Sequence, residues 1–390
     1  MEKGNKIRVG IMGAGTMGNG IAVLSAINGH DVIVFDNNTQ VLEKAKNESI
    51  KAIENLHSKN KLQNKSPQEV TSKMYYESDL GMFGICNLVI EAIVEDLTIK
   101  QVCYSELEQI VPEDCIIGSN TSSLSIASLS SSLKNPSRFL GIHFFNPPVV
   151  MKLVEIVPSL LTDIKILTDI KSLLQSWGKT TVLAKDTPGF IVNRIARPFY
   201  TEALRIFDEG IADIPTIDWA MKEIGGFKMG PFELMDLIGN DVNYKVTESI
   251  FEQSYFEPRF KPSITQKRLV EAKMFGKKTG RGFYDYSLEN QPKPNTDRKL
   301  GTKIFNRILA QLINEASDSL LFGIATKEDI DLAMTLGVNY PKGLLKWADE
   351  IGISNVINQL QALFDEYGED RYRISPMLKR MADRGWKFYN

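Results

Sequence analysis

Cysteine, long apolar runs and an excess of charge of one sign are all scarce in this sequence. Its 390 residues include 3 cysteines, Cys86, Cys103 and Cys115, and no apolar run approaches the length that crosses a bilayer. Cysteines this sparse form no disulfide framework, and their spacing is not that of a metal site, so we expect no metal. The N-terminal sequence has no signal-peptide core, and together these absences predict a cytoplasmic protein.

Charge is nearly balanced along the chain. The 46 lysines and arginines are offset by 48 acidic residues, which leaves a formal net charge of -2. Such a balance gives no electrostatic reason to bind nucleic acid or an anionic membrane, so neither is expected as a partner. A hydrophobic content of 43% and a charged content of 24% are typical of a globular protein, and the length allows two or three domains.

A glycine-rich motif follows a short β-branched run, residues 7–11, near the N-terminus. Glycines at the spacing of G-A-G-T-M-G allow a tight turn and a close approach of the backbone to a pyrophosphate, which the next helix binds with its N-terminal N–H groups. The motif alone is a weak signal. Here a helical pattern follows it, and a second strand at 32–35 completes a βαβ unit, which makes the signal strong. The three glycines are Gly13, Gly15 and Gly18.

An acidic residue, Asp36, stands at the end of the second expected strand. A carboxylate there bonds the adenosine ribose hydroxyls of a dinucleotide and repels a 2′-phosphate. The alternative is a surface aspartate that merely follows a strand. The complete βαβ context favours the functional interpretation, so the sequence predicts NAD as the cofactor and disfavours NADP.

Polar residues follow the later strands as well. The buried run 88–94 precedes Glu95 and Lys100, and the run 116–118 opens into the hydroxyl-rich segment 119–123. Ligands of open α/β sheets bind where the strands end, although one of these hydroxyls is expected to cap a helix instead. The long segment 39–71 either lies idle on the surface or forms part of a ligand site.

A histidine and a glutamate interrupt the apolar stretch 140–157. Glu155 lies between Leu153, Val154, Ile156 and Val157, and a carboxylate buried there without a partner would cost several kcal/mol. His143 is the nearest candidate partner, since the Pro147-Pro148 pair can turn the two runs back toward each other. Such a pair forms a general base, but a core histidine after a strand remains an equal alternative from this stretch alone.

The sequence becomes helical after Asp186, where we expect a domain boundary. The segment that starts at Asn193 recurs from Asn306, an offset of 113 residues (306 − 193), and residues 290–300 form a Pro-rich linker between the copies. The predicted fold is therefore a Rossmann-type doubly wound α/β domain, 1–186, followed by two tandem all-α domains, 187–290 and 301–390.

The chain resembles the 3-hydroxyacyl-CoA dehydrogenase family, including short-chain 3-hydroxybutyryl-CoA dehydrogenases, over nearly its full length. The motifs that carry the resemblance are GAGTMG, EAIVED, SNTSSL, HFFNPP with MKLVEIV, PGFIVNR, GPFELMDLIG and GRGFYDY.

The resemblance implies site residues by position. The catalytic residues would be Ser122, His143, Glu155 and Asn193. The NAD contacts would be Gly13, Gly15, Thr16, Met17, Gly18, Asp36, Glu95, Lys100, Ser122 and Asn146. Lys59 would contact the CoA moiety of an acyl-CoA substrate, whereas a CoA-contacting serine of some relatives falls on Ala52 here.

The function expected from the resemblance is reversible NAD-dependent oxidation of (S)-3-hydroxyacyl-CoA, such as 3-hydroxybutyryl-CoA, to 3-oxoacyl-CoA in fatty-acid β-oxidation or related acyl-CoA metabolism. In this mechanism His143 removes the C3 hydroxyl proton, Glu155 stabilises the imidazolium, and Ser122 and Asn193 hold the C3 oxygen. Two alternatives remain: a hydroxy-acid dehydrogenase that does not use CoA, and an NAD-binding protein without redox activity.

The second helical copy has no sheet domain ahead of it and no full counterpart of GKKTGRGFYDY before Asn390. Family members with one copy commonly pair it with that of a second subunit. We expect the two copies to pair internally as a pseudo-dimer, while a homodimer remains possible and an independent module for a protein partner is the alternative.

Overall fold

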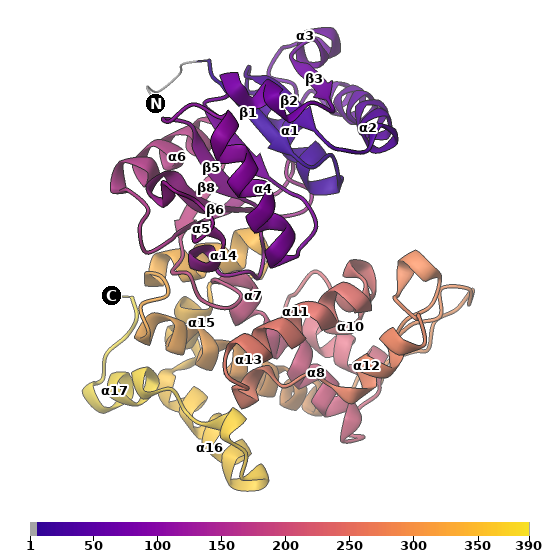
Figure 1. Cartoon of the computed structure of the whole chain (residues 1–390). Coiled ribbons are helices and arrows are strands. Elements are labelled where there is room, and N and C mark those ends of the chain that lie inside the picture. Colours follow the sequence, from indigo (N-terminus) through magenta and orange to yellow (C-terminus); the bar gives the residue numbers. More distant parts are fainter. Residues whose placement is uncertain (1–5, 390) are drawn as a thin grey trace. The chain divides into compact units, whose positions relative to one another are not determined.

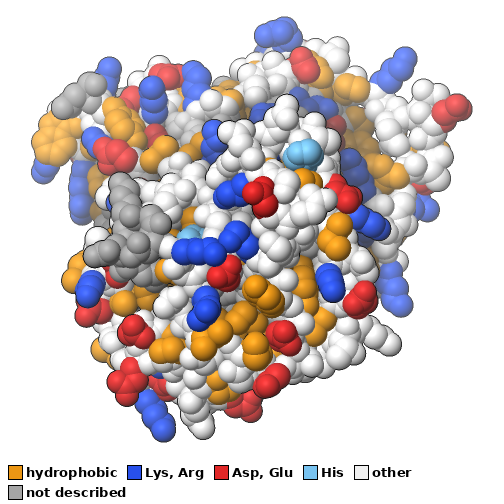
Figure 2. Space-filling model, turned by 90° about the horizontal axis from the view of Figure 1, so that it is seen from above, with side chains coloured by type: hydrophobic (Ala, Val, Ile, Leu, Met, Phe, Trp, Pro, Cys, Tyr) orange, Lys and Arg blue, Asp and Glu red, His pale blue; other side chains and the backbone are white. Residues whose placement is uncertain are grey.

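The structure, a computed structural model, describes residues 6–389 and forms two compact units, Met1–Asp186 and Thr187–Asn390 (Figure 1). The expected helical segments 187–290 and 301–390 both fall within the second unit. No helix in the described range is long and apolar enough to span a membrane. On the face seen from above, acidic and basic side chains are interspersed (Figure 2), in keeping with the near-zero net charge.

The first unit is built on a sheet with the strand order β3-β2-β1-β4-β5-β6-β7-β8. Strands β1 to β6 run parallel, β7 is antiparallel to β6, and β8 is parallel to β7. The order reverses at β1, so a ligand crevice is expected between the carboxyl ends of β1 and β4. The strands are β1 (Arg8–Met12), β2 (Asp31–Phe35), β3 (Met74–Glu77), β4 (Leu88–Glu91), β5 (Ile116–Ser119), β6 (Phe139–Phe144), β7 (Leu153–Pro158) and β8 (Thr180–Leu183).

Helices connect these strands, and apolar side chains such as Val9, Ile11 and Ile90 in the central strands are fully buried. The long segment expected after β2 forms the 20-residue helix α2, capped by Asn38, and the short helix α3, which begins with a capping box at Ser66. The helices are α1 (Thr16–Ile27), α2 (Thr39–Ser58), α3 (Pro67–Thr71), η1 (Leu80–Ile85), α4 (Leu97–Ile110), α5 (Ile126–Ser130), η2 (Pro136–Arg138) and α6 (Ile164–Ser176). The predicted doubly wound fold is confirmed.

The second unit is helical, as predicted. Its first copy contains α7 (Val192–Ile195), α8 (Arg197–Asp208), α9 (Ile214–Trp219), η3 (Ala220–Ile224), α10 (Pro231–Ile238), α11 (Asn240–Gln253), η4 (Pro258–Phe260), α12 (Ile264–Glu271) and η5 (Lys277–Thr279). Its second copy contains α13 (Arg298–Leu321), α14 (Lys327–Gly337), α15 (Leu344–Ile351), α16 (Ile353–Tyr367), η6 (Asp370–Tyr372) and α17 (Pro376–Arg384).

The sequence repeat is also a repeat of structure. Asp218 accepts two backbone hydrogen bonds at the start of α10, and Asp331 accepts two at the start of α15. The helix junctions α10-α11 and α15-α16 each turn at a glycine with positive φ, 103° at Gly239 and 87° at Gly352. Equivalent residues therefore make equivalent local contacts in the two copies.

The end of the chain keeps part of the tail of the first copy. Asp236 accepts hydrogen bonds from the backbone N–H groups of Phe283 and Tyr284, at 3.0 and 2.9 Å. Asp349 accepts the same pair from Phe388 and Tyr389, at 2.9 and 2.8 Å. The counterpart is thus partial, and it is a Phe-Tyr pair held by the equivalent aspartate.

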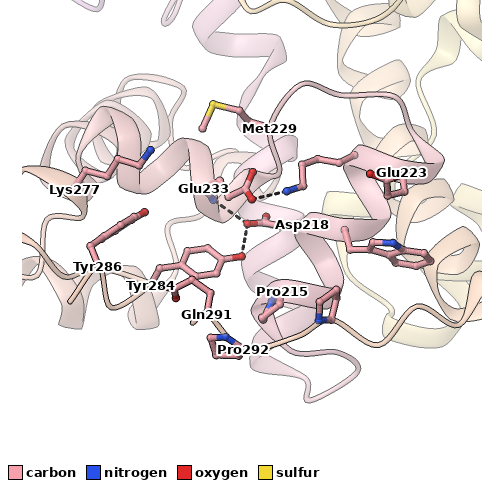
Figure 3. A pocket seen from close by; sticks show the side chains of 13 residues that line it. Pro215, Asp218, Glu223, Met229, Glu233, Lys277, Tyr284, Tyr286, Gln291 and Pro292 are labelled. Atoms are coloured by element: carbon pink, nitrogen blue, oxygen red, sulfur yellow. Dashed lines mark hydrogen bonds and ion pairs between the residues drawn. The ribbon is translucent and has the colours of Figure 1, made fainter. Parts of the chain in front are cut away.

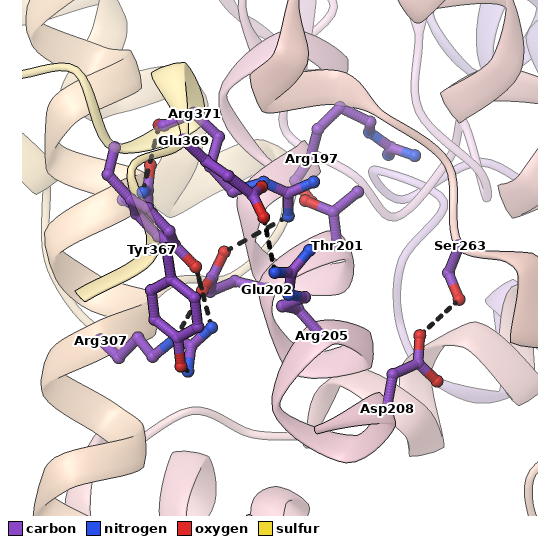
Figure 4. Close-up of polar contacts among 12 residues, drawn as sticks. Arg197, Thr201, Glu202, Arg205, Asp208, Ser263, Arg307, Tyr367, Glu369 and Arg371 are labelled. Carbon is purple, nitrogen blue, oxygen red and sulfur yellow. Dashed lines mark hydrogen bonds and ion pairs between the residues drawn. The ribbon is translucent and has the colours of Figure 1, made fainter. Parts of the chain in front are cut away.

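The two copies pack against each other through α8 and α13. Arg307 on α13 bonds Glu202 on α8 in a network of charged and tyrosine side chains that also includes Arg205, Tyr367 and Glu369 (Figure 4). Internal pairing of the copies is therefore a feature of the second unit. The oligomeric state of the whole chain stays a prediction.

Candidate active site

The glycine-rich loop after β1 has a backbone conformation and close contacts that leave no room for a Cβ atom at two positions. Gly13 has φ of 103°, its N–H donates to Phe35 O at 2.8 Å, and a Cβ there would lie 2.7 Å from the Ala92 carbonyl oxygen. A Cβ on Gly18 would lie 1.9 Å from the Gly13 carbonyl oxygen. The first glycine therefore makes the tight turn, and Gly18 allows α1 to pack closely on it.

The N-terminus of α1 is open for a phosphate group. Gly15 is its N-cap and supplies no side-chain cap, and a Cβ built on Gly15 would meet nothing within 4 Å. Gly15 and Thr16 are exposed, while Met17 is half-buried. The N–H groups of the first turn and the helix dipole can therefore face a pyrophosphate, as the motif predicts.

Asp36 is held beside this loop. One carboxylate oxygen accepts a hydrogen bond from Ala14 N and the other accepts one from Asn38 N, both at 3.0 Å. The carboxylate therefore lies at the end of β2 next to the glycine-rich turn, which is where the ribose of a dinucleotide would be bound. The loop, the helix end and Asp36 together fit NAD.

Glu95 organises the loop that contains Ser122. One oxygen of Glu95 accepts from Thr121 Oγ1 at 2.5 Å, from Ser122 N at 3.0 Å and from Ser123 Oγ at 3.2 Å. Burial opposes ionisation of Glu95, but the Lys100 charge and these hydrogen bonds outweigh it and lower the pKa of the carboxyl group. A charged Glu95 thus fixes the Ser122 loop after β5 against the loop after β4.

Lys100 lies inside the unit, bound to two carboxylates. Its Nζ is 2.5 Å from Glu91 Oε1 and 3.2 Å from Glu95 Oε2, and Lys100 and Glu91 are both buried. Glu91 also accepts hydrogen bonds from Tyr104 and Ser119. Lys100 therefore supports Glu95, and a direct contact with NAD stays a prediction. Our sequence reading missed Glu91, although an acidic end to the apolar run LVIE could have signalled it.

His143 and Glu155 form the expected pair. They are register partners in the antiparallel strands β6 and β7, and His143 Nδ1 lies 2.6 Å from Glu155 Oε2. Glu155 is fully buried and His143 is 5% exposed. A carboxylate at Nδ1 favours the tautomer with the proton on that nitrogen, so the lone pair lies on Nε2. The arrangement suits a general base.

The turn between β6 and β7 is held by a lysine that our sequence reading did not single out. Lys179, just before β8, donates from Nζ to the carbonyl oxygens of Pro148 and Met151. Burial lowers the pKa of Lys179 to about 8. Asn146, a predicted NAD contact, is exposed in the same turn. Lys179 therefore fixes the backbone that carries Asn146 and joins the strands of His143 and Glu155.

The remaining predicted residues lie on other elements. Asn193 is half-buried on α7 of the second unit. Lys59 is exposed as the C-cap of α2, and Ala52 is exposed on the same helix. The roles of Asn193 and Lys59 stay predictions.

The second unit also has a pocket of about 550 Å³ (Figure 3). Four of its polar groups are paired with one another: Asp218 accepts from the Tyr284 hydroxyl at 2.7 Å, and Lys222 binds Glu233 at 2.5 Å. Burial raises the pKa of Asp218 to about 7. None of the predicted catalytic residues lines this pocket, and its central aspartate already caps α10. The pocket is lined by Pro215, Asp218, Trp219, Lys222, Glu223, Met229, Glu233, Lys277, Tyr284, Tyr286, Gln291, Pro292 and Pro294.

Comparison with known families agrees with this geometry. Residues 8–187 match the family model described as 3-hydroxyacyl-CoA dehydrogenase, NAD binding domain. The model of the C-terminal domain matches twice, at 189–286 and 304–387. The chain belongs to the 3-hydroxyacyl-CoA dehydrogenase family. The predicted family and NAD as cofactor are confirmed, and the chain is an oxidoreductase of fatty-acid metabolism with 3-hydroxyacyl-CoA dehydrogenase activity.

Some individual relatives match nearly the whole of this chain, and others match about 70% of it. The 3-hydroxyadipyl-CoA dehydrogenase of Escherichia coli (strain K12) is 33% identical, over 96% of this chain and 97% of its own. The mitochondrial hydroxyacyl-coenzyme A dehydrogenase of Sus scrofa is 38% identical, over 71% of this chain and 90% of its own. A crystal structure of 3-hydroxybutyryl-CoA dehydrogenase from Escherichia coli K12 has a TM-score of 0.91 at 33% identity and covers 97% of this chain and 99% of its own.

Proposed function

We propose that this dehydrogenase oxidises the C3 hydroxyl of short (S)-3-hydroxyacyl-CoA thioesters, such as 3-hydroxybutyryl-CoA, and also runs in reverse. The observation that carries the proposal is the buried His143–Glu155 pair on an NAD-binding sheet. A histidine whose Nδ1 is held by a carboxylate can accept a proton at Nε2, as oxidation of an alcohol requires. The presence of this pair argues against a binding protein without redox activity.

His143 and Glu155 would handle the proton. Nε2 of His143 takes the hydroxyl proton as the C3–O bond gains double-bond character, and bound NAD supplies the acceptor for the C3 hydride. Glu155, 2.6 Å from Nδ1, then stabilises the imidazolium. In the reduction of a 3-oxoacyl-CoA the same imidazolium returns the proton.

Ser122 and Asn193 would hold the C3 oxygen as it changes between hydroxyl and carbonyl. Glu95 supports this role of Ser122, because it accepts a hydrogen bond from the Ser122 backbone N–H at 3.0 Å. Lys59, exposed at the end of α2, would bind the CoA moiety.

We also propose a cytoplasmic location.

The printed name of the Escherichia coli relative suggests a second substrate class, acyl chains that end in a carboxylate, and the buried Arg197 is a candidate to bind that carboxylate. Arg197 is 3% exposed, donates to Asn193 O at 2.8 Å and to Thr247 Oγ1 at 3.0 Å, and pairs with no carboxylate among the described residues. Burial of this guanidinium lowers its pKa, so its charge is poorly compensated. A dicarboxylyl chain, like the one in the name of the Escherichia coli relative, would supply the anion.

The test is NADH formation by the purified protein with 3-hydroxybutyryl-CoA, 3-hydroxyadipyl-CoA and free 3-hydroxybutyrate. We expect turnover of the thioesters and not of the free acid. Equal turnover of the free acid would contradict a CoA substrate. The Arg197→Gln variant should lower kcat/KM for 3-hydroxyadipyl-CoA more than for 3-hydroxybutyryl-CoA, and an unchanged ratio would remove the second substrate class.

A further inference from the structure

The two helical copies are joined by a reciprocal pair of ion pairs. Arg194 Nε of the first copy lies 2.7 Å from Glu315 Oε1 of the second, and Arg307 Nε of the second lies 2.6 Å from Glu202 Oε1 of the first. Arginine and glutamate are both shifted by the 113 residues of the repeat (307 − 194 and 315 − 202). This is the contact pattern of a two-fold interface, here formed within one chain.

The surroundings of the two ion pairs also match. Each glutamate faces a second arginine, Arg259 at 3.2 Å from Glu315 and Arg371 at 4.0 Å from Glu202. The arginine of each reciprocal ion pair also lies over an aromatic ring. Arg194 lies over Phe260 at 5.2 Å, and Arg307 lies over Tyr372 at 5.9 Å. Both glutamates are buried, at 0% exposure for Glu315 and 2% for Glu202. The chain thus contains two versions of one contact.

Only one version adjoins a residue with a proposed role in the reaction. Arg194 directly follows Asn193 on α7, which has 4 residues. Gly189 and Phe190, just before α7, have φ of 77° and 49°. The helix therefore begins after a left-handed turn. α7 continues into α8 through Ala196, which is the C-cap of α7 and the N-cap of α8, so the start of α7 is the end that tertiary contacts must position. Arg307 instead lies within the 24-residue helix α13.

We propose that Glu315, on the second copy, is a positioning residue for the reaction: it fixes Arg194 and thereby the turn that presents Asn193 to the C3 oxygen. The inference rests on the proposed function. It gives the second copy a part in the reaction although that copy carries no reacting group. Glu315 acts through Arg194 and does not touch substrate. Its equivalent Glu202, facing Arg307, holds the copies together without setting any reacting residue.

The matched variants Glu315→Gln and Glu202→Gln test this inference. Each weakens the ion pairs of one buried glutamate with two arginines, so both should lower the melting temperature to a similar extent. Misplacement of Asn193 should lower kcat for 3-hydroxyacyl-CoA in Glu315→Gln by about 10-fold to 100-fold, with KM for NAD unchanged. Glu202→Gln should keep kcat within about twofold. Equal effects of the two variants on kcat would overturn the inference.

A double-mutant cycle with Asn193→Ala separates positioning from general loosening. If Glu315 acts through Asn193, the change Glu315→Gln should have little further effect on kcat once Asn193 is truncated. Additive losses would overturn the inference. Should the glutamine variants not fold, Arg194→Lys and Arg307→Lys give the same comparison with the charges kept. A wild-type protein inactive on acyl-CoA would overturn the proposed function itself, which is a different outcome from any of these.

Discussion

At the scale of single residues, the chemistry depends on charges that the fold keeps apart from water. Glu155 is fully buried and has His143 at 2.6 Å, while Lys100 is buried between Glu91 and Glu95. A buried charge is tolerated when it is paired and hydrogen-bonded, and removal of one partner leaves the other unpaired. Substitution of one residue in either group should therefore also change the environment of its partner, which would be left buried without its counter-charge.

Glu155→Gln should slow turnover while the fold is kept. The amide can still accept the hydrogen bond from His143 but cannot stabilise an imidazolium, so kcat should fall, and His143→Ala should lower it by roughly 10²-fold to 10⁴-fold, as for a lost general base. Steady-state kinetics and NAD titration measure both effects, and NAD affinity should stay nearly unchanged. Wild-type kcat in His143→Ala would remove this residue from the mechanism, and in Glu155→Gln it would leave Glu155 a structural role.

Asp36→Ala should narrow the preference for NAD over NADP. The carboxylate lies beside the glycine-rich turn, where it would bond the ribose hydroxyls and repel a 2′-phosphate. The ratio of kcat/KM values for the two cofactors is the measurement. A ratio equal to that of the wild type would place the ribose contact elsewhere.

At the scale of elements, the sheet is tied to its outer helices by buried polar contacts as well as by apolar packing. Just before β2, His30 accepts a hydrogen bond from Trp177 Nε1, at the end of α6, at 2.8 Å. Burial, followed by the charge of Lys65, lowers the pKa of His30 to about 4. This contact therefore requires a neutral imidazole.

The His30 contact should make the protein less stable in acid. An unfolded histidine has a pKa of about 6.5, so the unfolded chain binds the proton first as the pH falls. The stability from a neutral His30 is fully present above about pH 6.5 and is lost toward pH 4, by up to about 3.5 kcal/mol at roughly 1.4 kcal/mol per pH unit. Urea unfolding of wild type and His30→Gln across this range measures it, and equal pH slopes would argue against His30 as the source.

At the scale of the whole molecule, the second helical copy gives the first an internal partner. Apolar residues of α13, including Leu312, Ile313 and Ala316, are fully buried, and Arg307 of α13 reaches Glu202 on α8. The Sus scrofa relative matches 71% of this chain, whereas the Escherichia coli relative matches 96%. The match to the Escherichia coli relative therefore includes most of the second copy.

Deletion of the residues after Leu300 should expose the face of α8 that α13 covers. The truncated protein should dimerise or aggregate and melt at a lower temperature, because an apolar surface with buried charges would face water. In a dimer of truncated chains, a second subunit could supply the glutamate that replaces Glu315. Light scattering and thermal unfolding measure the outcome. A truncated protein that stays monomeric, fully active and equally heat-stable would contradict internal pairing, as would a full-length dimer paired through its first copy.

Local sequence alone determined most strands of the sheet, although not β3 and β8, and also the glycine-rich turn, Asp36 and the helical repeat. These features are contiguous, and their physical requirements, such as a positive φ at Gly13, act within a few residues. The pairing of His143 with Glu155 could also be proposed, because only the short connection 145–152 separates their strands.

Only the tertiary structure decided which charged groups meet partners that are distant along the chain. Lys179 holds the turn at Pro148, and the ion pair of Arg194 with Glu315 links the two copies. Each partner was visible in the sequence as one of many lysines, arginines and acids. Ion pairing depends on strand register and helix packing, which are set by burial of the apolar faces around the charges, and no local pattern records that choice.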